Sequence, residues 1–233
     1  MTTTNQRFHP QRAGKVNASE CHVLFTDTGN VTDGLTKGQI TYAEKLAIQS
    51  YFHHYDEVQS WRFEHGHMAE PFGIEYLNKH YKSNVVAIPQ SDYLWNEEFQ
   101  YGGGGDAIDE YNGIALSEDA GYDIKAPTSL LKWGSYITSG ISKQQYHQCQ
   151  MYMELYKKKR WYIAAFLMEN VWMIQNEETY PVPEHQRMIL VEVTREEGWK
   201  EKLEAITPKI IAMRDDFYNK LKTQFNETDT SRQ

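Results

Sequence analysis

The chain has 233 residues, of which 40% are hydrophobic and 24% are charged, and this size and composition predict one large domain with a core of its own. Its two cysteines, Cys21 and Cys149, are too few for a disulfide framework or a cysteine-rich structural zinc site. A net charge of −8 argues against broad electrostatic adhesion to nucleic acid, although a local positive groove or a metal site can still bind a phosphate.

The sequence also argues against entry into a membrane. Its first residues carry no apolar segment of the kind that makes a secretory signal. No stretch approaches the roughly 18 to 20 consecutive apolar residues that a transmembrane helix needs. We therefore expect a cytoplasmic protein, with a single domain over residues 11–225 and flexible, polar ends at residues 1–10 and 226–233.

Taken in chain order, the pattern first predicts two helices, over residues 39–53 and 62–80, with a kink or local unwinding at Pro71. Strands are predicted over residues 85–89, 92–95 and 121–127, and a third helix over residues 141–158. The apolar runs 161–167 and 171–175 predict a hairpin buried on both faces. A strand over residues 188–193 and a helix over residues 196–225, interrupted at Pro208, follow. This order predicts an α/β fold with a mixed central β-sheet flanked by α-helices.

The residues best suited to chemistry lie between positions 102 and 127. Four consecutive glycines, residues 102–105, lead to Asp106, and glycine permits close approach of the main chain to a ligand. Alone, the glycine run is more typical of a flexible hairpin tip. Asp123 and Lys125 are two residues apart on a predicted strand, so their side chains project from the same face. Alone, this pair is more typical of a surface ion pair.

Three neighbours in the sequence favour a catalytic interpretation of the pair. Asp106 precedes Asp123 by 123 − 106 = 17 residues, which one hairpin can span, Glu70 lies on the second predicted helix and Gln150 on the third. Mg²⁺ prefers oxygen ligands, usually one or two carboxylates with water and substrate phosphate. Lys125 could then orient or deprotonate the attacking water and neutralise phosphate charge. Other nearby carboxylates compete for assignment, namely Asp109, Glu110, Glu118 and Asp119.

The order Glu70, Asp106, Asp123-x-Lys125, Gln150 resembles the PD-(D/E)xK nuclease superfamily, and specifically the phage lambda-type exonuclease, or YqaJ-like viral recombinase, family. Similar segments extend over about residues 11–222: RAGKVNAS (12–19), RFEHGHMAEPFGIEYLN (62–78, with Gly66 and Glu70 in the matching places), DIKAP (123–127), QCQMY (148–152) and the last strand and helix from residue 191. Two departures stand out. Asp123 replaces the family's usual glutamate, and Asp106 lies in a Gly-Asp-Ala rather than a Pro-Asp-Gly context.

The resemblance implies a restriction-endonuclease-like core and a Mg²⁺-dependent exonuclease, with Mn²⁺ as a possible alternative, that digests one strand of double-stranded DNA from 5′ to 3′. It further implies a ring-shaped homotrimer, a single-strand annealing protein as partner, and a phage or prophage protein that acts in homologous recombination in the bacterial host. An endonuclease of the same superfamily, or a catalytically inactive DNA-binding recombination scaffold, is the alternative. The intact Asp106, Asp123 and Lys125 favour an enzyme over a scaffold.

The resemblance also assigns roles to single residues. The metal ligands would be Asp106, Asp123 and the main-chain carbonyl of Ile124, with Glu70 completing the acidic cluster or acting through water. Lys125 would orient the nucleophilic water, and Gln150 would form hydrogen bonds in the same site. The 5′-terminal phosphate of the substrate strand would be held by Arg12 and Ser19. Without the resemblance, the favoured interpretation is an ordinary surface arginine and a serine that caps a helix.

Two further groups of residues admit more than one interpretation. The pairs His53-His54 and His65-x-His67 suggest metal ligands, but neither pair has a third ligand at suitable spacing, and surface histidines are the favoured interpretation. The basic run of residues 157–160 indicates either a solvated turn after a helix or a contact with DNA.

Overall fold

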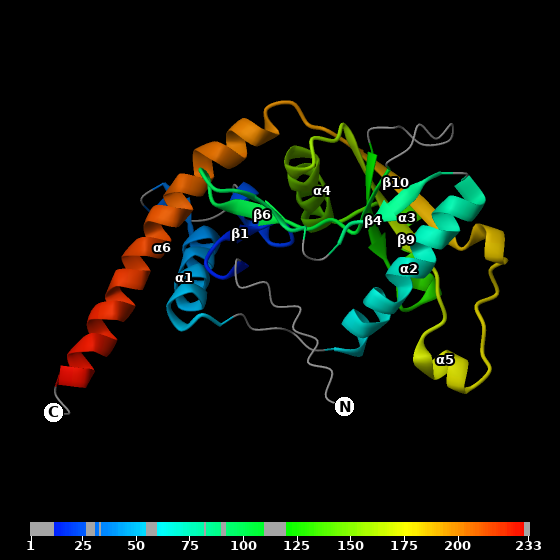
Figure 1. Ribbon diagram of the computed structural model, residues 1–233, viewed down its shortest axis with the longest axis horizontal. Coiled ribbons are helices and arrows are strands. Elements are labelled where there is room, and N and C mark those ends of the chain that lie inside the picture. Colours follow the sequence, from blue (N-terminus) through cyan, green and yellow to red (C-terminus); the bar gives the residue numbers. More distant parts are fainter. Residues whose placement is uncertain are drawn as a thin grey trace. The chain divides into compact units, whose positions relative to one another are not determined.

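The computed structural model describes residues 12–26, 31–32, 34–54, 60–81, 83–89, 92–109 and 120–230 (Figure 1). The chain forms two compact units. Met1–Glu57, Trp95–Gly103 and Glu197–Gln233 make up the first unit, and Val58–Leu94 with Gly104–Glu196 makes up the second. The boundaries expected for one domain over residues 11–225 stay a prediction. Residues 1–10 lie outside the described part of the chain, as do residues 231–233 at the other end.

The second unit is built on a five-stranded mixed sheet. Its strands are β4 (Val85–Ala87), β7 (Ala107–Asp109), β8 (Ala120–Lys125), β9 (Arg160–Phe166) and β10 (Met188–Thr194), in the spatial order β10-β9-β8-β7-β4. The central strands β8 and β9 run parallel, and the other neighbours are antiparallel. Residues 161–166 of β9 are buried on both faces, as their near-continuous hydrophobicity predicted. The mixed sheet with helices confirms the α/β prediction.

Helices cover both faces of this sheet. On one face, α2 (Trp61–Tyr81) contributes Ala69, Tyr76 and Leu77 to a core that also contains Tyr122 and Ile124 of β8. On the other face lie α4 (Lys143–Leu155) and α3 (Leu130–Thr138), a helix that the sequence interpretation missed. The α4 helix begins with a capping box, in which the side chains of Ser142 and Gln145 satisfy each other's main-chain N–H groups.

Three local predictions are wrong. Residues 171–175 form a short helix, α5 (Val171–Gln175), because the Asn170 side chain accepts a hydrogen bond from the Met173 N–H and caps it. The antiparallel partner of β9 is therefore β10, which follows the short 3-10 helix η3 (Glu184–Gln186). The helices α2 and α6 (Trp199–Thr230) continue without unwinding through Pro71 and Pro208, respectively, while the alternative of a kink at Pro71 stays a prediction.

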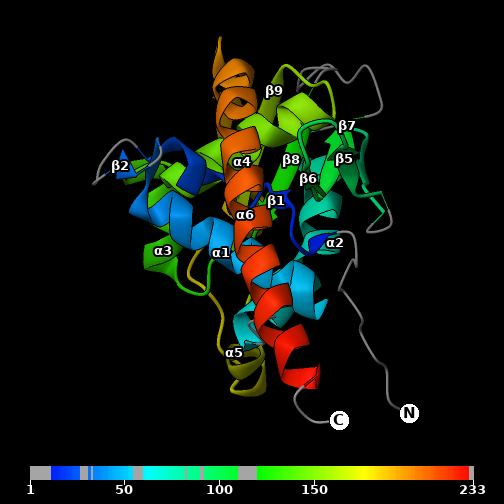
Figure 2. The ribbon, with the colours of Figure 1, turned by 90° about the vertical axis from the view of Figure 1, so that its left-hand side faces the viewer.

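The first unit combines short strands with two long helices. β1 (Val16–Asn17) pairs in parallel with β6 (Tyr101–Gly103), which β5 (Leu94–Asn96) flanks on its other side. A second ribbon pairs β2 (Val31–Thr32) with β3 (Leu35–Thr36), and a 3-10 helix, η2, spans Cys21–Phe25. α1 (Lys37–Phe52) packs beside α6 (Figure 2). Arg214 of α6 donates hydrogen bonds to the Gly14 carbonyl and the Gln100 side chain, and so fixes α6 to the segments that precede β1 and β6.

None of the helices in the described part of the chain has both the length and the apolarity needed to cross a bilayer.

Candidate active site

Asp106 is fixed against the strand that carries Asp123 and Lys125. It lies immediately before β7, which pairs antiparallel with β8 so that Ala107 faces Tyr122. The Ile124 main-chain N–H donates a hydrogen bond of 2.6 Å to Asp106 Oδ2. The 17-residue separation is thus spanned by an antiparallel strand pair, as predicted, while residues 110–119 of the connection lie outside the described part.

Asp123 and Lys125 form a buried ion pair rather than a surface one. Lys125 Nζ lies 2.6 Å from Asp123 Oδ2. Asp123 is 1% exposed, whereas the Lys125 side chain keeps 30% of its surface accessible. A buried carboxylate requires compensation by charge or hydrogen bonds, and Lys125 supplies it while still reaching solvent. The interpretation as a surface ion pair is therefore wrong.

The electrostatics of these three residues are coupled. Burial, and then the negative charge of Asp123, raises the pKa of Asp106 well above its ordinary value. Burial alone would lower the pKa of Lys125, but the charges of Asp123 and Asp106 outweigh this effect and raise it. Two carboxylates share one ammonium, so the site holds an excess of negative charge that favours a bound cation or a proton.

The glycines before Asp106 have a packing role. Gly102 and Gly103 belong to β6 and are buried, so the interpretation as a flexible hairpin tip is wrong. A Cβ atom on Gly105 would lie 2.5 Å from the Trp161 ring, and one on Gly121 would lie 2.2 Å from it. Only glycine fits at these two positions. The fully buried Trp161 ring thus supports the segments that present Asp106 and Asp123.

Glu70 approaches the acidic pair but has a partner of its own. A Cβ atom on Gly73 would lie 2.8 Å from Ile124 Cγ2, so glycine lets α2 pack closely on β8, one turn beyond Glu70. The charge of Glu70 contributes to the raised pKa of Asp106. Its Oε1 atom lies 2.8 Å from His67 Nδ1. Over the described ranges, no group of three or more His, Cys, Asp or Glu side chains is arranged to hold a metal ion. The metal-site role expected for Glu70 stays a prediction, and the donors that could hold a metal are Asp106, Asp123 and the Ile124 carbonyl.

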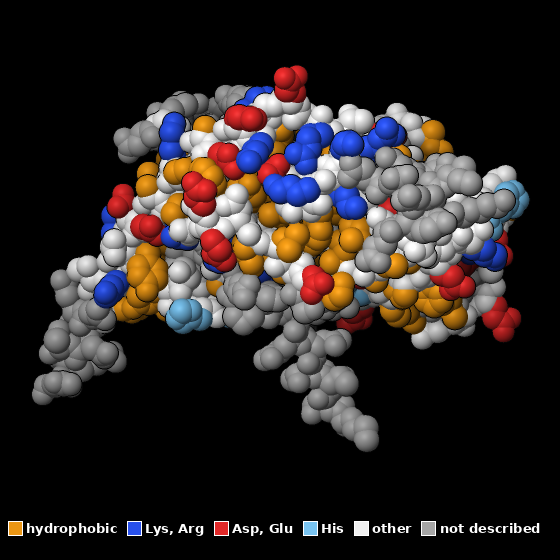
Figure 3. Space-filling model, turned by 45° about the horizontal axis from the view of Figure 1, so that its top comes forward, with side chains coloured by type: hydrophobic (Ala, Val, Ile, Leu, Met, Phe, Trp, Pro, Cys, Tyr) orange, Lys and Arg blue, Asp and Glu red, His pale blue; other side chains and the backbone are white. Residues whose placement is uncertain are grey.

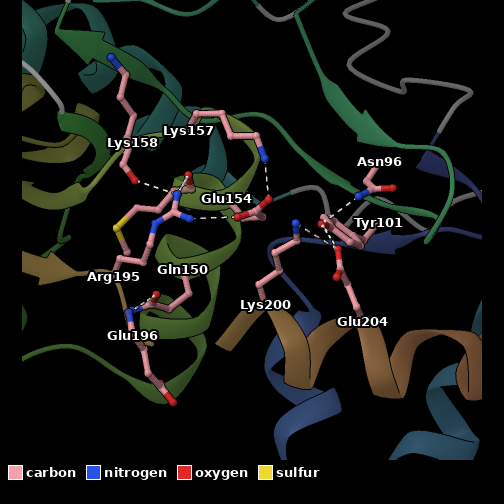
Figure 4. A network of polar contacts seen from close by, with 11 residues as sticks. Asn96, Tyr101, Gln150, Glu154, Lys157, Lys158, Arg195, Glu196, Lys200 and Glu204 are labelled. Atoms are coloured by element: carbon pink, nitrogen blue, oxygen red, sulfur yellow. Dashed lines mark hydrogen bonds and ion pairs between the residues drawn. The ribbon is translucent and has the colours of Figure 1, made fainter. Parts of the chain in front are cut away.

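Within the described residues, Gln150 bonds to the end of β10 rather than to the acidic pair, and Figure 4 shows its contact with Glu196. Its Nε2 atom donates to the Thr194 carbonyl at 2.8 Å, and its Oε1 atom accepts from the Glu196 N–H at 3.0 Å. These bonds fasten α4 to the end of β10. The contacts give Gln150 a positioning role, and its expected participation in the chemistry stays a prediction.

Two tyrosines, Tyr152 in α4 and Tyr156 at its C-terminal cap, were missed by the sequence interpretation. Burial, followed by the charges of Asp123 and Asp106, raises the pKa of Tyr152 well above its ordinary value. Its hydroxyl accepts a hydrogen bond of 2.8 Å from the Gln148 amide. Tyr156, one turn further, accepts a hydrogen bond from the Gly105 N–H at 3.2 Å. The spacing of residues 148, 152 and 156 places them on one helix face, and this spacing is the signal that could have revealed them.

The outcomes for the remaining candidates differ from residue to residue. The competing carboxylate Asp109 is buried, and after the effect of burial its charge helps to raise the pKa of Tyr122, which belongs to the core under α2. Glu110, Glu118 and Asp119 fall in the part that the structure does not describe. Arg12 and Ser19 belong to the first unit, where Arg12 Nε donates to Asn17 Oδ1 at 3.3 Å. Their phosphate-binding role stays a prediction.

The histidine pairs differ from each other. His53 and His54 are exposed, as expected for surface histidines. His65 is only 1% exposed, and neither of its ring nitrogens has a hydrogen-bond partner within the described residues. The surface interpretation is therefore wrong for His65, whose pKa burial lowers, and His67 is occupied by Glu70.

This geometry can be compared with that of known proteins. An alkaline exonuclease from Laribacter hongkongensis, LHK-Exo, matches with a TM-score of 0.71 at 15% sequence identity, over 97% of this chain and 100% of that chain. A phage-related exonuclease from Haemophilus somnus 129PT matches with a TM-score of 0.69 at 15% identity, over 91% of this chain and 96% of that chain. The chain shares the fold of these exonucleases. The restriction-endonuclease-like fold class predicted from the sequence is thereby confirmed. No family model and no curated protein sequence matches the chain.

Proposed function

We propose that this protein is a metal-dependent deoxyribonuclease that hydrolyses phosphodiester bonds of duplex DNA as an exonuclease. The observation that carries the proposal is the buried Asp123–Lys125 ion pair, with Asp106 bonded to the main chain between them. The shared fold adds support, since the similar proteins of known structure are exonucleases and one structure of LHK-Exo contains dAMP. That ligand is a deoxyribonucleotide, the product expected when an exonuclease degrades DNA.

The donor set fits a hard divalent cation. Mg²⁺, or Mn²⁺ in its place, would be held by Asp106, Asp123 and the carbonyl of Ile124, since Mg²⁺ usually takes one or two carboxylates and completes its shell with water and phosphate. The excess negative charge at this pair supports the assignment. When bound, such an ion lowers the pKa of coordinated water and neutralises charge that develops on the phosphate.

The protein's own side chains then have distinct tasks. Lys125 holds Asp123 in place through the ion pair of 2.6 Å, and its ammonium, which reaches solvent, orients the nucleophilic water and the scissile phosphate. Glu70, itself oriented by His67, acts on the site from α2, directly or through water. Tyr152, buried and hydrogen-bonded to Gln148, lies within electrostatic reach of Asp123 and Asp106 on the α4 side of the site.

The finer features of the proposed function rest on the resemblance of residues 12–19. We propose 5′ to 3′ digestion with Arg12 and Ser19 at the 5′-terminal phosphate, because arginine offers a planar fork of donors and serine a hydroxyl donor. Arg12→Ala should slow digestion of 5′-phosphorylated duplex strongly and of 5′-hydroxyl duplex much less. Equal wild-type rates on the two substrates would remove the reason for choosing this polarity.

The proposal extends to a homotrimer and to a single-strand annealing protein as partner in phage-type recombination in the bacterial host. A ring would hold the enzyme on its substrate between cuts. Light scattering should then give about three times the 27.3 kDa mass of the chain. A strictly monomeric protein would contradict the ring without touching the nuclease assignment.

One assay separates the proposed function from its alternatives. Blunt duplex DNA, labelled separately at each 5′ and 3′ end, is incubated with the protein in the presence of Mg²⁺ or EDTA. The proposal predicts mononucleotide release that begins at the 5′ ends, needs Mg²⁺ and stops in EDTA. Cutting of closed circular DNA would identify an endonuclease, and binding without any cleavage would identify a scaffold.

A further inference from the structure

A cluster of positive charge lies where α4 ends and β9 begins. Lys157, Lys158, Lys159 and Arg160 follow one another there, and Arg195 joins them from the end of β10. This turn lies at the top of Figure 1, and Figure 3, in which the top comes forward, shows Lys and Arg side chains gathered on that face. The chain as a whole carries a net charge of −8, so such a concentration of cations stands out from the average surface.

A single buried carboxylate organises this cluster. Glu154 is 5% exposed and forms ion pairs with two cations (Figure 4). Lys157 Nζ lies 2.5 Å from its Oε1 atom, and Arg195 Nη1 lies 3.0 Å from its Oε2 atom. Both carboxylate oxygens are thereby occupied, and the three residues together keep one positive charge in excess.

The same network fixes the main chain of Lys158. Its N–H donates to the Met153 carbonyl at 3.0 Å, and its own carbonyl accepts from Arg195 Nη2 at 2.9 Å. The preceding Lys157 adopts a left-handed conformation, with φ of 55°, which ends α4. Among the residues that the structure describes, none forms an ion pair with the Lys158 side chain, which extends away from the network in Figure 4. A fixed turn therefore holds Lys158, which is half-buried, with an ammonium that no ion pair neutralises within the described residues.

The turn is connected to the acidic pair through Tyr156, two residues before Lys158. The Tyr156 hydroxyl accepts a hydrogen bond from the N–H of Gly105, the residue directly before Asp106. The turn and the candidate metal ligand Asp106 are thus fixed to the same short segment.

We infer that Lys158 contacts a backbone phosphate of the DNA substrate near the one that is cleaved, and that Glu154, Lys157 and Arg195 form the rigid support of this contact. The inference rests on the proposed function and names a further substrate contact for it. A lysine ammonium binds a phosphate as a compact point charge, and such contacts set the register of DNA without reading its sequence. Of the two interpretations of the basic run, we adopt the contact with DNA, made by Lys158.

The test measures the salt dependence of DNA binding. Fluorescence anisotropy of a labelled blunt duplex, in EDTA to prevent cleavage, gives the dissociation constant over a series of salt concentrations. Each neutralised phosphate on duplex DNA contributes a slope of about −0.9 to the plot of log K against log salt. Lys158→Ala should make the slope less steep by about one such contribution. It should also weaken binding roughly fivefold, by the same factor for duplexes of different sequence. Lys158→Arg should keep the slope.

Lys79→Ala is the matched control. It removes the same charge from an exposed lysine of α2 that pairs with Glu184 at 2.7 Å, on the helix that covers the opposite face of the sheet. Its slope and affinity should equal those of the wild type. In steady-state digestion, Lys158→Ala should raise KM for duplex DNA and leave kcat unchanged.

The outcomes distinguish the inference from the proposed function. If the wild type cleaves duplex DNA and Lys158→Ala binds with the same slope and affinity as Lys79→Ala, the contact is overturned and the nuclease assignment stands. If the wild type neither binds nor cleaves DNA, the proposed function fails, and the inference fails with it.

Discussion

A strict steric requirement near the candidate site lies at Gly121, two residues before Asp123. A Cβ atom there would lie 2.2 Å from Cζ3 and 2.4 Å from Cε3 of the Trp161 ring, whereas carbon atoms in contact prefer about 3.5 to 4.0 Å. Gly121→Ala therefore requires the ring and the strand to separate by roughly 1 to 1.5 Å.

The ring has little room to move. On another side, a Cβ atom on Gly105 would lie 2.5 Å from Trp161 Cζ2, and the Tyr152 and Tyr156 rings have their centroids 5.0 and 5.6 Å from that of Trp161. Overpacking of a core costs about 1 to 3 kcal/mol, and a rigid ring enclosed on several sides corresponds to the upper end, about 3 kcal/mol. With a shift of about 2 to 4 °C per kcal/mol for a chain of this size, Tm should fall by about 6 to 12 °C.

Urea unfolding followed by circular dichroism measures the loss in unfolding free energy, and thermal unfolding measures the fall in Tm. Gly66→Ala is the matched control, because no atom lies within 4 Å of a Cβ there, and alanine inside a helix should stabilise the protein by about 0.5 to 1 kcal/mol. Trp161→Phe removes part of the obstructing ring, so the double variant should lose less stability than the sum of the two single variants. If Gly121→Ala is as stable as Gly66→Ala, the packing argument for Trp161 is refuted.

Two predictions concern pH. His65 is buried without a hydrogen-bond partner among the described residues, and burial lowers its pKa. As pH falls below about 6.5, the unfolded chain therefore binds a proton at His65 that the folded chain does not bind. The wild type should lose stability relative to His65→Leu over this pH range. A constant difference between the two proteins from pH 8 to pH 5 would contradict this. For Glu169, burial opposes ionisation but the Arg187 guanidinium, 2.7 Å away, outweighs it and lowers the pKa. The stability that this ion pair contributes is complete above the ordinary pKa of glutamate and is lost as pH falls through the lowered pKa of Glu169. The difference in unfolding free energy between wild type and Arg187→Gln should therefore become smaller in acid. A difference that becomes larger in acid would refute the role of the pair.

The positions of the long elements could be predicted from the sequence, but the faces they bury could not. The apolar spacing of Phe63, Met68 and Phe72 correctly indicated the α2 helix, yet these three side chains are exposed. The buried face carries Ala69 and Gly73 instead, because close packing on Ile124 requires small residues. A search for hydrophobic periodicity detects large apolar side chains. A close contact between a helix and a sheet instead requires small residues, which such a search overlooks.

Short and capped elements were the other source of error. The strands β1, β6 and β7 have two or three residues each, too few for an alternating pattern to emerge. Residues 171–175 have the composition of a strand, and only the cap at Asn170 distinguishes them as a helix. Pairing of β9 with the distant β10 then depends on tertiary packing, which no local pattern encodes.

For the candidate site, the alternation of Asp123 and Lys125 predicted their shared face, and the resemblance added Asp106. The burial of the pair and the support from Trp161 could not be read from the sequence, since both depend on strands brought together from distant segments. The pairing of Glu70 with His67 follows a spacing of three residues on a helix and was within reach of the sequence.

The central claim is that Asp106, Asp123 and Lys125 form the hydrolytic site. It is tested most directly by the rate at which Asp123→Asn digests end-labelled duplex DNA with Mg²⁺, measured beside Asp109→Asn, a control at the buried carboxylate of the neighbouring strand. Folded Asp123→Asn should lose about two or more orders of magnitude in rate. Asp109→Asn, once shown to be folded, should keep wild-type activity, and Asp123→Glu should retain substantial activity. Digestion at the wild-type rate by folded Asp123→Asn would contradict the assignment and place the active site elsewhere. Loss of digestion in Asp109→Asn alone would contradict it in the same way.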